Sequence, residues 1–174
     1  MSVVEDRQVA VPATSGSTSS EPDNPLRRAL GHMATSVTLV TTTHDGGHHG
    51  FTANSFAAVS SDPPLVTVFL ANSATCYGAF AETEHVAVNV LADGQGELAR
   101  RFATKGADKF AGIDLDPRHP HLPVVAGAMA SLIGRIDQRW PAGDHLMLLI
   151  AVDDVVFDRK EPLVYHNRTF RRLL

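Results

Sequence analysis

The feature that most constrains the fold is a series of short β-branched or apolar segments separated by turn-forming residues. Segments of this kind occupy residues 35–43, 48–55, 65–70, 86–91, 128–139, 145–157 and 163–165. Between the first two, Asp45-Gly46 predicts a hairpin, because this pair supplies the positive φ angles that a tight turn needs. The pattern therefore predicts about seven strands, most of them arranged in hairpin-like runs.

Helices are expected to be few and short. One should begin at Asn24-Pro25, since an Asx residue before proline is typical of a helix start. Others are expected from Ser73 or Thr75 through Ala81, and from residue 94 to residue 103. Because strands do not alternate strictly with helices, the sequence predicts a mainly β fold, an antiparallel barrel with helical insertions, and not a doubly wound sheet.

The chain of 174 residues is long enough for one domain. Residues 1–23 include the low-complexity run Thr14–Ser20, which offers nothing to bury and so predicts a disordered N-terminal tail. The folded domain is expected to span residues 24–174, with no inner boundary.

Charge and composition exclude several classes of function. The net charge is −4 and there is no basic run, so neither nucleic acid nor an anionic membrane surface is an expected partner. A single cysteine, Cys76, excludes an internal disulfide and a thiolate zinc cage. With no apolar run of about 20 residues and no signal-peptide pattern, a cytoplasmic protein is expected.

Familiar catalytic motifs are missing from the sequence. It contains no G-x-G-x-x-G, no G-x-x-x-x-G-K-[ST] and no G-x-S-x-G, which argues against a Rossmann fold, a P-loop and an α/β-hydrolase. His44, His48 and His49 gather on the first hairpin, but His48 and His49 should point to opposite faces of a strand. We therefore expect solvated turn residues there and no metal site.

The segment Gly50–Ser60 is more informative. A strand ends there in small and hydroxyl-bearing residues, which leave backbone N–H groups and hydroxyls with little steric cover. Such a segment could hold an anionic or flat polar ligand through main-chain donors. On composition alone, a plain polar loop between strands is the simpler interpretation.

The motifs of the chain resemble those of a known family. Thr52-Ala53-Asn54-Ser55-Phe56, followed by Ser60-x-Asp62-Pro63-Pro64, resembles the flavin reductase family of split-barrel FMN-binding proteins. Further matches lie, in the order of the chain, at 30–38, 69–75, 88–91, 95–112, 143–145 and 162–165, so the resemblance covers about residues 25 to 172. One departure is Ser36, where the family usually has glycine. The resemblance implies an antiparallel, Greek-key split barrel.

It also implies a site. Flavin in such proteins lies at a dimer interface, held largely by main-chain groups. The residues that the resemblance assigns to cofactor binding are Thr35, Ser36, Val37, Ala53, Asn54, Ser55, Ser60, Ser73, Thr75, Asn89, Arg101 and Tyr165, with His145 beside the reacting rings. Alternatives stay open: Asn89 could serve the backbone, Arg101 could be a solvated helix charge, and Ser73 or Thr75 could cap a helix.

The function that the resemblance implies is an NAD(P)H:flavin oxidoreductase. It would use NADH or NADPH to reduce FMN or FAD, as a homodimer, and would supply the reduced flavin to a separate flavin-dependent monooxygenase. Two alternatives remain, namely a split-barrel oxidase that retains its flavin and a non-catalytic flavin-binding domain. Hydride transfer between the two cofactors needs no acid–base pair from the protein, which agrees with the lack of an obvious one.

Overall fold

The computed structural model describes residues 24–173, so the expected N-terminal tail, residues 1–23, lies outside the described residues. The helices are α1 (Pro25–Gly31), α2 (Tyr77–Glu82) and α3 (Gly96–Ala103). The strands are β1 (Thr35–Ser36), β2 (Thr38–His44), β3 (Gly47–Ala53), β4 (Ala57–Ser61), β5 (Pro64–Ala71), β6 (His85–Val90), β7 (Ala130–Ala142), β8 (His145–Phe157), β9 (Val164–His166) and β10 (Thr169–Arg171).

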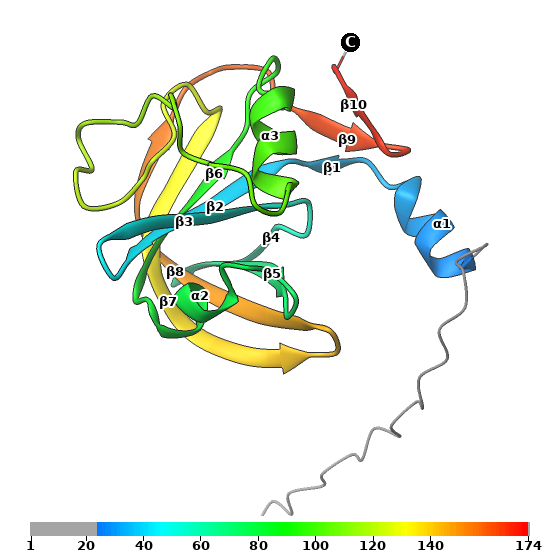
Figure 1. The fold of residues 1–174 in the computed structure, drawn as a ribbon. Helices are drawn as coiled ribbons and strands as arrows, with labels where there is room; N and C mark the ends of the chain where they lie inside the picture. The colour runs from blue at the N-terminus through cyan, green and yellow to red at the C-terminus, as the bar shows by residue number, and fades with distance from the viewer. Residues whose placement is uncertain (1–23, 174) are drawn as a thin grey trace, which may run out of the picture.

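The strands form two antiparallel sheets. Seven strands follow the order β3-β2-β6-β7-β8-β5-β4 and curl into a barrel, while β1, β9 and β10 form a small second sheet beside α1 (Figure 1). The neighbours β2–β6 and β5–β8 are distant in sequence, as a Greek-key arrangement requires. The expected mainly β antiparallel barrel with helical insertions is confirmed.

Local sequence signals account for several element boundaries. Asn24 caps α1, since its Oδ1 atom accepts a hydrogen bond from the Leu26 N–H at 3.0 Å and Pro25 opens the helix. The β2–β3 turn has Asp45 at φ 49° and Gly46 at φ 72°, the two positive angles expected for this hairpin. Both features could be predicted because they depend on residues adjacent in sequence.

The structure differs from the expected elements in three places. The run 35–43 is divided into β1 and β2, because residues on either side of Val37 pair with different sheets. Strands β4 and β10 were not expected, and each is a short edge strand with an irregular polar pattern. Helix α2 begins at Tyr77 with no side-chain cap at Cys76, so the alternative in which Ser73 or Thr75 caps it does not hold.

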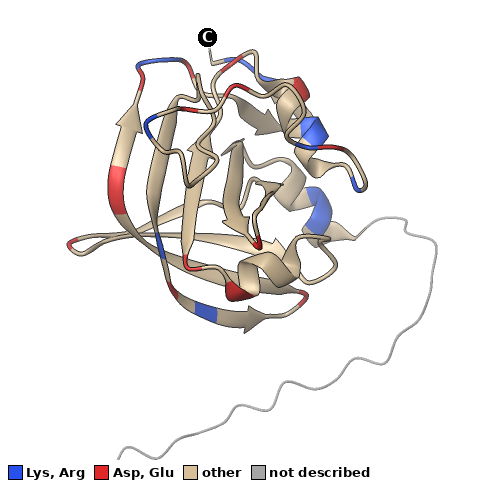
Figure 2. Cartoon of the chain, turned by 60° about the vertical axis from the view of Figure 1, so that its left-hand side comes forward, with Lys and Arg blue, Asp and Glu red and all other residues tan. Residues whose placement is uncertain are grey.

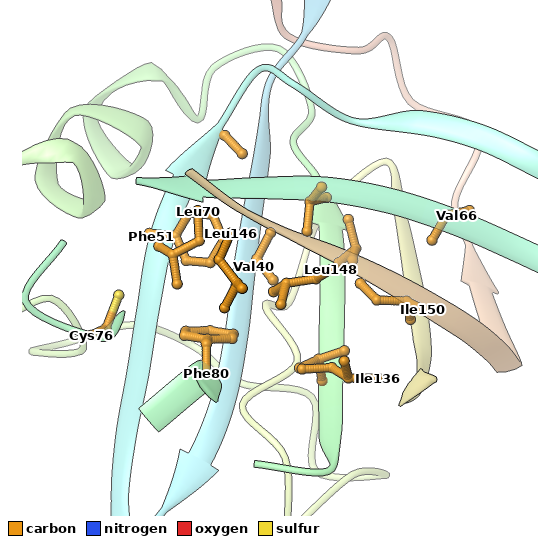
Figure 3. Packing of buried hydrophobic residues seen from close by; sticks show 14 residues of the cluster. Val40, Phe51, Val66, Leu70, Cys76, Phe80, Ile136, Leu146, Leu148 and Ile150 are labelled. Carbon is orange, nitrogen blue, oxygen red and sulfur yellow. The ribbon is translucent and has the colours of Figure 1, made fainter. Parts of the chain in front are cut away.

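The barrel interior holds the main hydrophobic core. Side chains from β2, β3, β5, β6, β7, β8 and α2 meet there, and Phe80 of α2 lies against Phe51 with ring centroids 5.0 Å apart (Figure 3). A second cluster lies between the barrel and α3, where Phe102 and Ala99 pack on Leu39 and Leu91. This cluster fixes α3 across the end of β3.

Along residues 24–173, no helix has both the length and the apolar character needed to cross a membrane.

Candidate functional site: a groove beside strand β3 and helix α3

Two adjoining cavities form a groove along the end of β3 and α3. The hairpin cavity, of about 450 Å³, is lined by Val37, Thr52, Asn54, Ala99, Arg100, Ala103, Tyr165, Arg168, Thr169 and Phe170. The loop cavity, of about 320 Å³, includes Ala53, Asn54, Ser55, Ser73, Thr75, Lys105, Lys109 and His145. Both include Thr52, Asn54 and Ala103, so the two cavities adjoin along this wall. Each is within the usual size of a small-molecule site.

Hydroxyl groups anchor the end of β3 in this position. Thr52 Oγ1 donates to the carbonyl of Ala99 at 2.7 Å and so ties β3 to α3. Ser55 Oγ accepts from the backbone N–H of Phe69 at 3.3 Å and ties the segment to β5. Asn54 lies between these two anchors and is exposed to both cavities. The segment Thr52–Ser55 is thus a rigid wall of the groove.

The loop cavity is lined by hydroxyl groups and by two lysines. Ser73 and Thr75 are exposed in the turn before α2, and neither caps that helix. Lys109 crosses to the other wall, where its Nζ donates to the Gly50 carbonyl at 3.0 Å. Hydroxyl donors and ammonium groups around one cavity are suited to a phosphate.

His145 enters the loop cavity from the start of β8. It pairs with Ala71 across the β5–β8 ladder, which places it beside the turn that carries Ser73. Its Nδ1 atom lies 2.6 Å from Oδ1 of Asp144. This hydrogen bond and the ring's positive charge when protonated lower the pKa of the Asp144 carboxyl. A hydrogen bond to the exposed Asp144 carboxylate therefore orients the His145 ring.

The hairpin cavity has an aromatic wall. Tyr165 of β9 and Phe170 of β10 meet with ring centroids 5.6 Å apart, and the Arg100 guanidinium lies 5.0 Å from the Phe170 centroid. Thr35 pairs with Tyr165 in the β1–β9 ladder. The buried Thr35 Oγ1 atom has no hydrogen-bond partner among residues 24–173.

Five expected site residues line neither cavity of the groove: Thr35, Ser36, Ser60, Asn89 and Arg101. Asn89 is fully buried and uses its whole amide within the chain: Nδ2 donates to the Leu39 carbonyl and to Thr41 Oγ1, and Oδ1 accepts from Val125 N–H and Ser131 Oγ–H. No position is left for a flavin edge. The buried amide thus serves the barrel, as the alternative interpretation held.

Arg101 and Ser60 also lie apart from both cavities. The Arg101 Nη1 atom donates to the Ala111 carbonyl at 2.7 Å, and the neighbouring Arg100 lines the groove in its place. Ser60 lies on β4, beside the irregularity in the β4–β5 ladder. Ser36, which pairs with Val164 in the small sheet, does not line either cavity among the described residues.

The sequence did not indicate several residues that line the groove. Arg100 and Ala103 are three residues apart on α3 and so share one helix face, but only the packing of Phe102 shows which face meets β3. Arg168 and Phe170 come from a hairpin whose second strand was not expected. Lys105 and Lys109 lie in a long loop with no local pattern to orient them.

Comparison with known proteins identifies the family. The model of the flavin reductase like domain matches residues 30–174. The chain belongs to the flavin reductase-like family. It is 42% identical over 150 residues to the actinorhodin polyketide dimerase of Streptomyces coelicolor, covering 85% of each chain. It is 34% identical over 145 residues to the reductase component of 4-nitrophenol 4-monooxygenase/4-nitrocatechol 2-monooxygenase of Rhodococcus opacus, covering 83% of this chain and 78% of that protein.

A solved structure shares the fold of this flavin reductase-like domain. The NADH:FAD oxidoreductase SgcE6 of Streptomyces globisporus, in complex with NAD and FAD fragments, superimposes with a TM-score of 0.80 at 33% identity. The match covers 89% of this chain and 98% of that one. The resemblance to the flavin reductase family and the split-barrel fold are therefore confirmed.

The groove of this domain fits a flavin by its chemistry. Among the described residues that line the two cavities there is no aspartate or glutamate, although the chain carries 19 acidic residues. The polar lining instead includes hydroxyls, a histidine and cationic side chains. The Thr35 hydroxyl, which has no hydrogen-bond partner among residues 24–173, lies next to Tyr165 of the aromatic wall in the β1–β9 ladder. A phosphate-bearing ligand with a flat polar ring would meet hydroxyl donors and cationic side chains in this groove.

Proposed function

We propose that this chain is an NAD(P)H:flavin oxidoreductase, in which the groove holds a flavin and a nicotinamide with their rings stacked. The observation that carries the proposal is a groove of two adjoining cavities in a flavin reductase-like domain, lined by hydroxyls and cations and by no carboxylate among its described residues. The Streptomyces globisporus oxidoreductase, whose structure holds NAD and FAD fragments, supports the same pair of ligands.

We assign the roles of the lining residues on the basis of their positions. The wall Thr52–Ser55 supports the flavin ring through main-chain groups, since its two hydroxyl anchors keep that wall fixed. Ser73, Thr75 and Lys105 hold the flavin phosphate in the loop cavity. His145, oriented by Asp144, positions the nicotinamide against the flavin ring.

The bound flavin supplies the redox chemistry, because its ring accepts a hydride from the reduced nicotinamide. The protein therefore contributes ring alignment and exclusion of water, and no side chain has to move a proton for this transfer. The absence of a carboxylate among the described lining residues is consistent with a transfer that needs no proton from a side chain.

A homodimer is part of the proposal. Helix α1 has no buried residue in the single chain, and Leu26, Leu30 and Met33 are 65%, 53% and 55% exposed. An isolated seven-residue helix is not stable in water by itself, so a partner surface is expected to cover this apolar face. A second copy of the chain meets this need. In sedimentation, the parent should be a dimer at micromolar protein and Leu30→Asp should be largely monomeric, whereas a parent monomer with full activity would refute the dimer.

The reduced flavin is proposed to serve a separate flavin-dependent monooxygenase, as the name of the Rhodococcus opacus relative indicates for that protein. The decisive experiment follows NADH oxidation by its near-ultraviolet absorbance, with and without free FMN or FAD. Turnover that depends on added flavin supports a reductase. Turnover without added flavin indicates an oxidase that retains its flavin, and bound flavin that NADH does not bleach indicates a non-catalytic binding domain.

A further inference from the structure

A separate basic pocket lies next to the groove, between α1 and the β9–β10 hairpin. This arginine pocket, of about 360 Å³, is lined by Asn24, Arg27, Arg28, Gly31, His32, Asn167 and Arg168. The backbone N–H of Asn167 donates to the Gly31 carbonyl at 2.7 Å and docks the hairpin tip on the end of α1. The His32 and His166 rings meet edge to face beside it, with ring centroids 6.3 Å apart.

Arg168 connects this pocket to the groove, because it lines both the arginine pocket and the hairpin cavity. Its guanidinium has no hydrogen-bond or ion-pair partner within residues 24–173. In contrast, Arg172 on the same segment pairs with Asp93, and Arg100 pairs with Glu97. Arg168 is thus a cation at a junction of two cavities with no counter-charge from the described part of the chain.

The backbone at Arg168 gives an independent indication. Asn167 and Arg168 have φ angles of 49° and 58°, so the hairpin tip is a tight turn with both central residues in the left-handed region. Glycine is preferred at the second of these positions, and a side chain there carries a steric cost. The chain places arginine where glycine would fit more easily, which is expected where the side chain has a use.

The charge around the pocket points to an anion. Among its described lining residues there are three arginines and one histidine and no acidic side chain, in a chain of net charge −4. Arg27 and Arg28 make interactions of their own, so Arg168 is the cation that this pocket offers to a ligand. Figure 2 shows basic segments of α1 and α3 on the same side of the molecule. A guanidinium fork binds phosphate through paired hydrogen bonds, and the volume exceeds what inorganic phosphate alone needs.

We propose that the arginine pocket binds the phosphate groups on the adenosine half of the nicotinamide dinucleotide, with Arg168 as the contact that joins this pocket to the groove. This assignment rests on the proposed function, since the groove is where the nicotinamide would lie. Two sources share the phosphate chemistry: the diphosphate bridge, present in NADH and NADPH, and the 2′-phosphate of NADPH.

The test uses Arg168→Gly, because glycine relieves the positive φ and should leave the fold as stable as the parent or more so. Arg168→Lys keeps a charge, and Arg171→Gln, on the same hairpin but outside all three cavities, is the matched control. Binding of 5′-ADP, 2′-AMP and adenosine to the purified protein is measured by calorimetry at low and at physiological ionic strength.

The parent should bind a phosphate-bearing probe more tightly than adenosine, with an affinity that falls as salt is raised. Arg168→Gly should lose about tenfold to a hundredfold of that affinity and raise the KM for the dinucleotide, with a melting temperature no lower than the parent's. Arg168→Lys should lose less, and Arg171→Gln nothing. A preference for 5′-ADP identifies the diphosphate, and a preference for 2′-AMP identifies the 2′-phosphate of NADPH.

Equal binding of adenosine and the phosphate-bearing probes, or unchanged binding by Arg168→Gly, would overturn the assignment. These measurements need no turnover. If the protein binds 5′-ADP through Arg168 but does not oxidise NADH, the proposed function fails and the anion site stands. If the protein oxidises NADH and Arg168→Gly binds 5′-ADP as the parent does, the proposed function stands and the anion site fails.

Discussion

Oδ1 of Asp144 lies 2.6 Å from Nδ1 of His145, so two consecutive residues form a hydrogen-bonded pair, of which His145 lines the loop cavity. The ring lowers the pKa of the Asp144 carboxyl, first through this hydrogen bond and then through its charge. A carboxyl pKa lower in the folded than in the unfolded chain adds stability above the unfolded value of about 3.9. That stability is lost as the pH falls through the folded value.

The first prediction tests this pair. His145→Ala should raise the pKa of the Asp144 carboxyl toward its ordinary value, as measured by carbon-detected NMR titration of the side chain. His85→Ala, a change of an exposed histidine outside the groove, is the control and should leave the Asp144 titration unaltered. An Asp144 titration that is the same in His145→Ala and in the parent would show that the pair does not persist in solution.

The second prediction concerns the reaction. If His145 positions the nicotinamide, His145→Ala should raise the KM for NADH or slow flavin reduction by about ten- to a hundredfold, the scale of a misplaced reacting pair. Flavin affinity, measured by fluorescence quenching, should change much less. Asp144→Ala should show a smaller effect in the same direction, since it leaves the ring in place but unsupported. If His145→Ala has the same kinetics as the parent, His145 does not position the nicotinamide and is only a structural residue of β8.

The third prediction separates two candidate phosphate contacts. Thr75→Val keeps the shape of the exposed threonine but removes its hydroxyl, so FMN affinity should fall about tenfold, the value of one hydrogen bond to a charged group. Riboflavin, which has no phosphate, should bind as before.

Arg101→Ala is the contrasting variant. Its guanidinium is bound to the Ala111 carbonyl, so its loss should lower the free energy of unfolding by about 1 kcal/mol and leave the ratio of FMN to riboflavin affinity unchanged. A selective loss of FMN binding in Arg101→Ala would restore the role that the sequence resemblance implied.

The fourth prediction concerns Asn89. Asn89→Ala leaves the buried Val125 N–H and Ser131 hydroxyl without their acceptor, and should lower the free energy of unfolding by about 2–4 kcal/mol. The folded fraction should bind flavin with the parent affinity, because the amide does not reach the groove. Denaturant unfolding and flavin titration of the same sample test both statements, and a variant that is stable but binds flavin weakly would contradict them.

The fifth prediction concerns Gly134 in β7, where the β7–β8 ladder shifts register. A Cβ atom at this position would overlap the Ala151 carbonyl oxygen, which is backbone and cannot turn aside. Gly134→Ala should therefore cost about 2–3 kcal/mol or more of stability. Gly78→Ala in α2, where a Cβ meets nothing within 4 Å, should instead be neutral or stabilising by up to about 1 kcal/mol. Equal melting temperatures for the two variants would contradict the proposed contact.

The sequence by itself determined the features that depend on neighbours along the chain. Asn24-Pro25 sets the start of α1, Asp45-Gly46 sets the first hairpin, and the apolar runs set most strands, because capping, turn geometry and strand periodicity are local effects. The motif at Thr52–Ser55 likewise indicated one wall of the groove, since strand-end hydroxyls are visible without the fold.

Only the tertiary structure decided which side chains meet. The sequence could not show that Asn89 finds its four partners on other strands and a loop, that Arg100 and not Arg101 faces the groove, or that Arg168 joins two cavities. Each of these depends on the rotation of a strand or helix about its own axis and on contacts between segments far apart in the chain. Packing of buried side chains such as Phe102 and Leu39 fixes those rotations, and no local pattern contains that information.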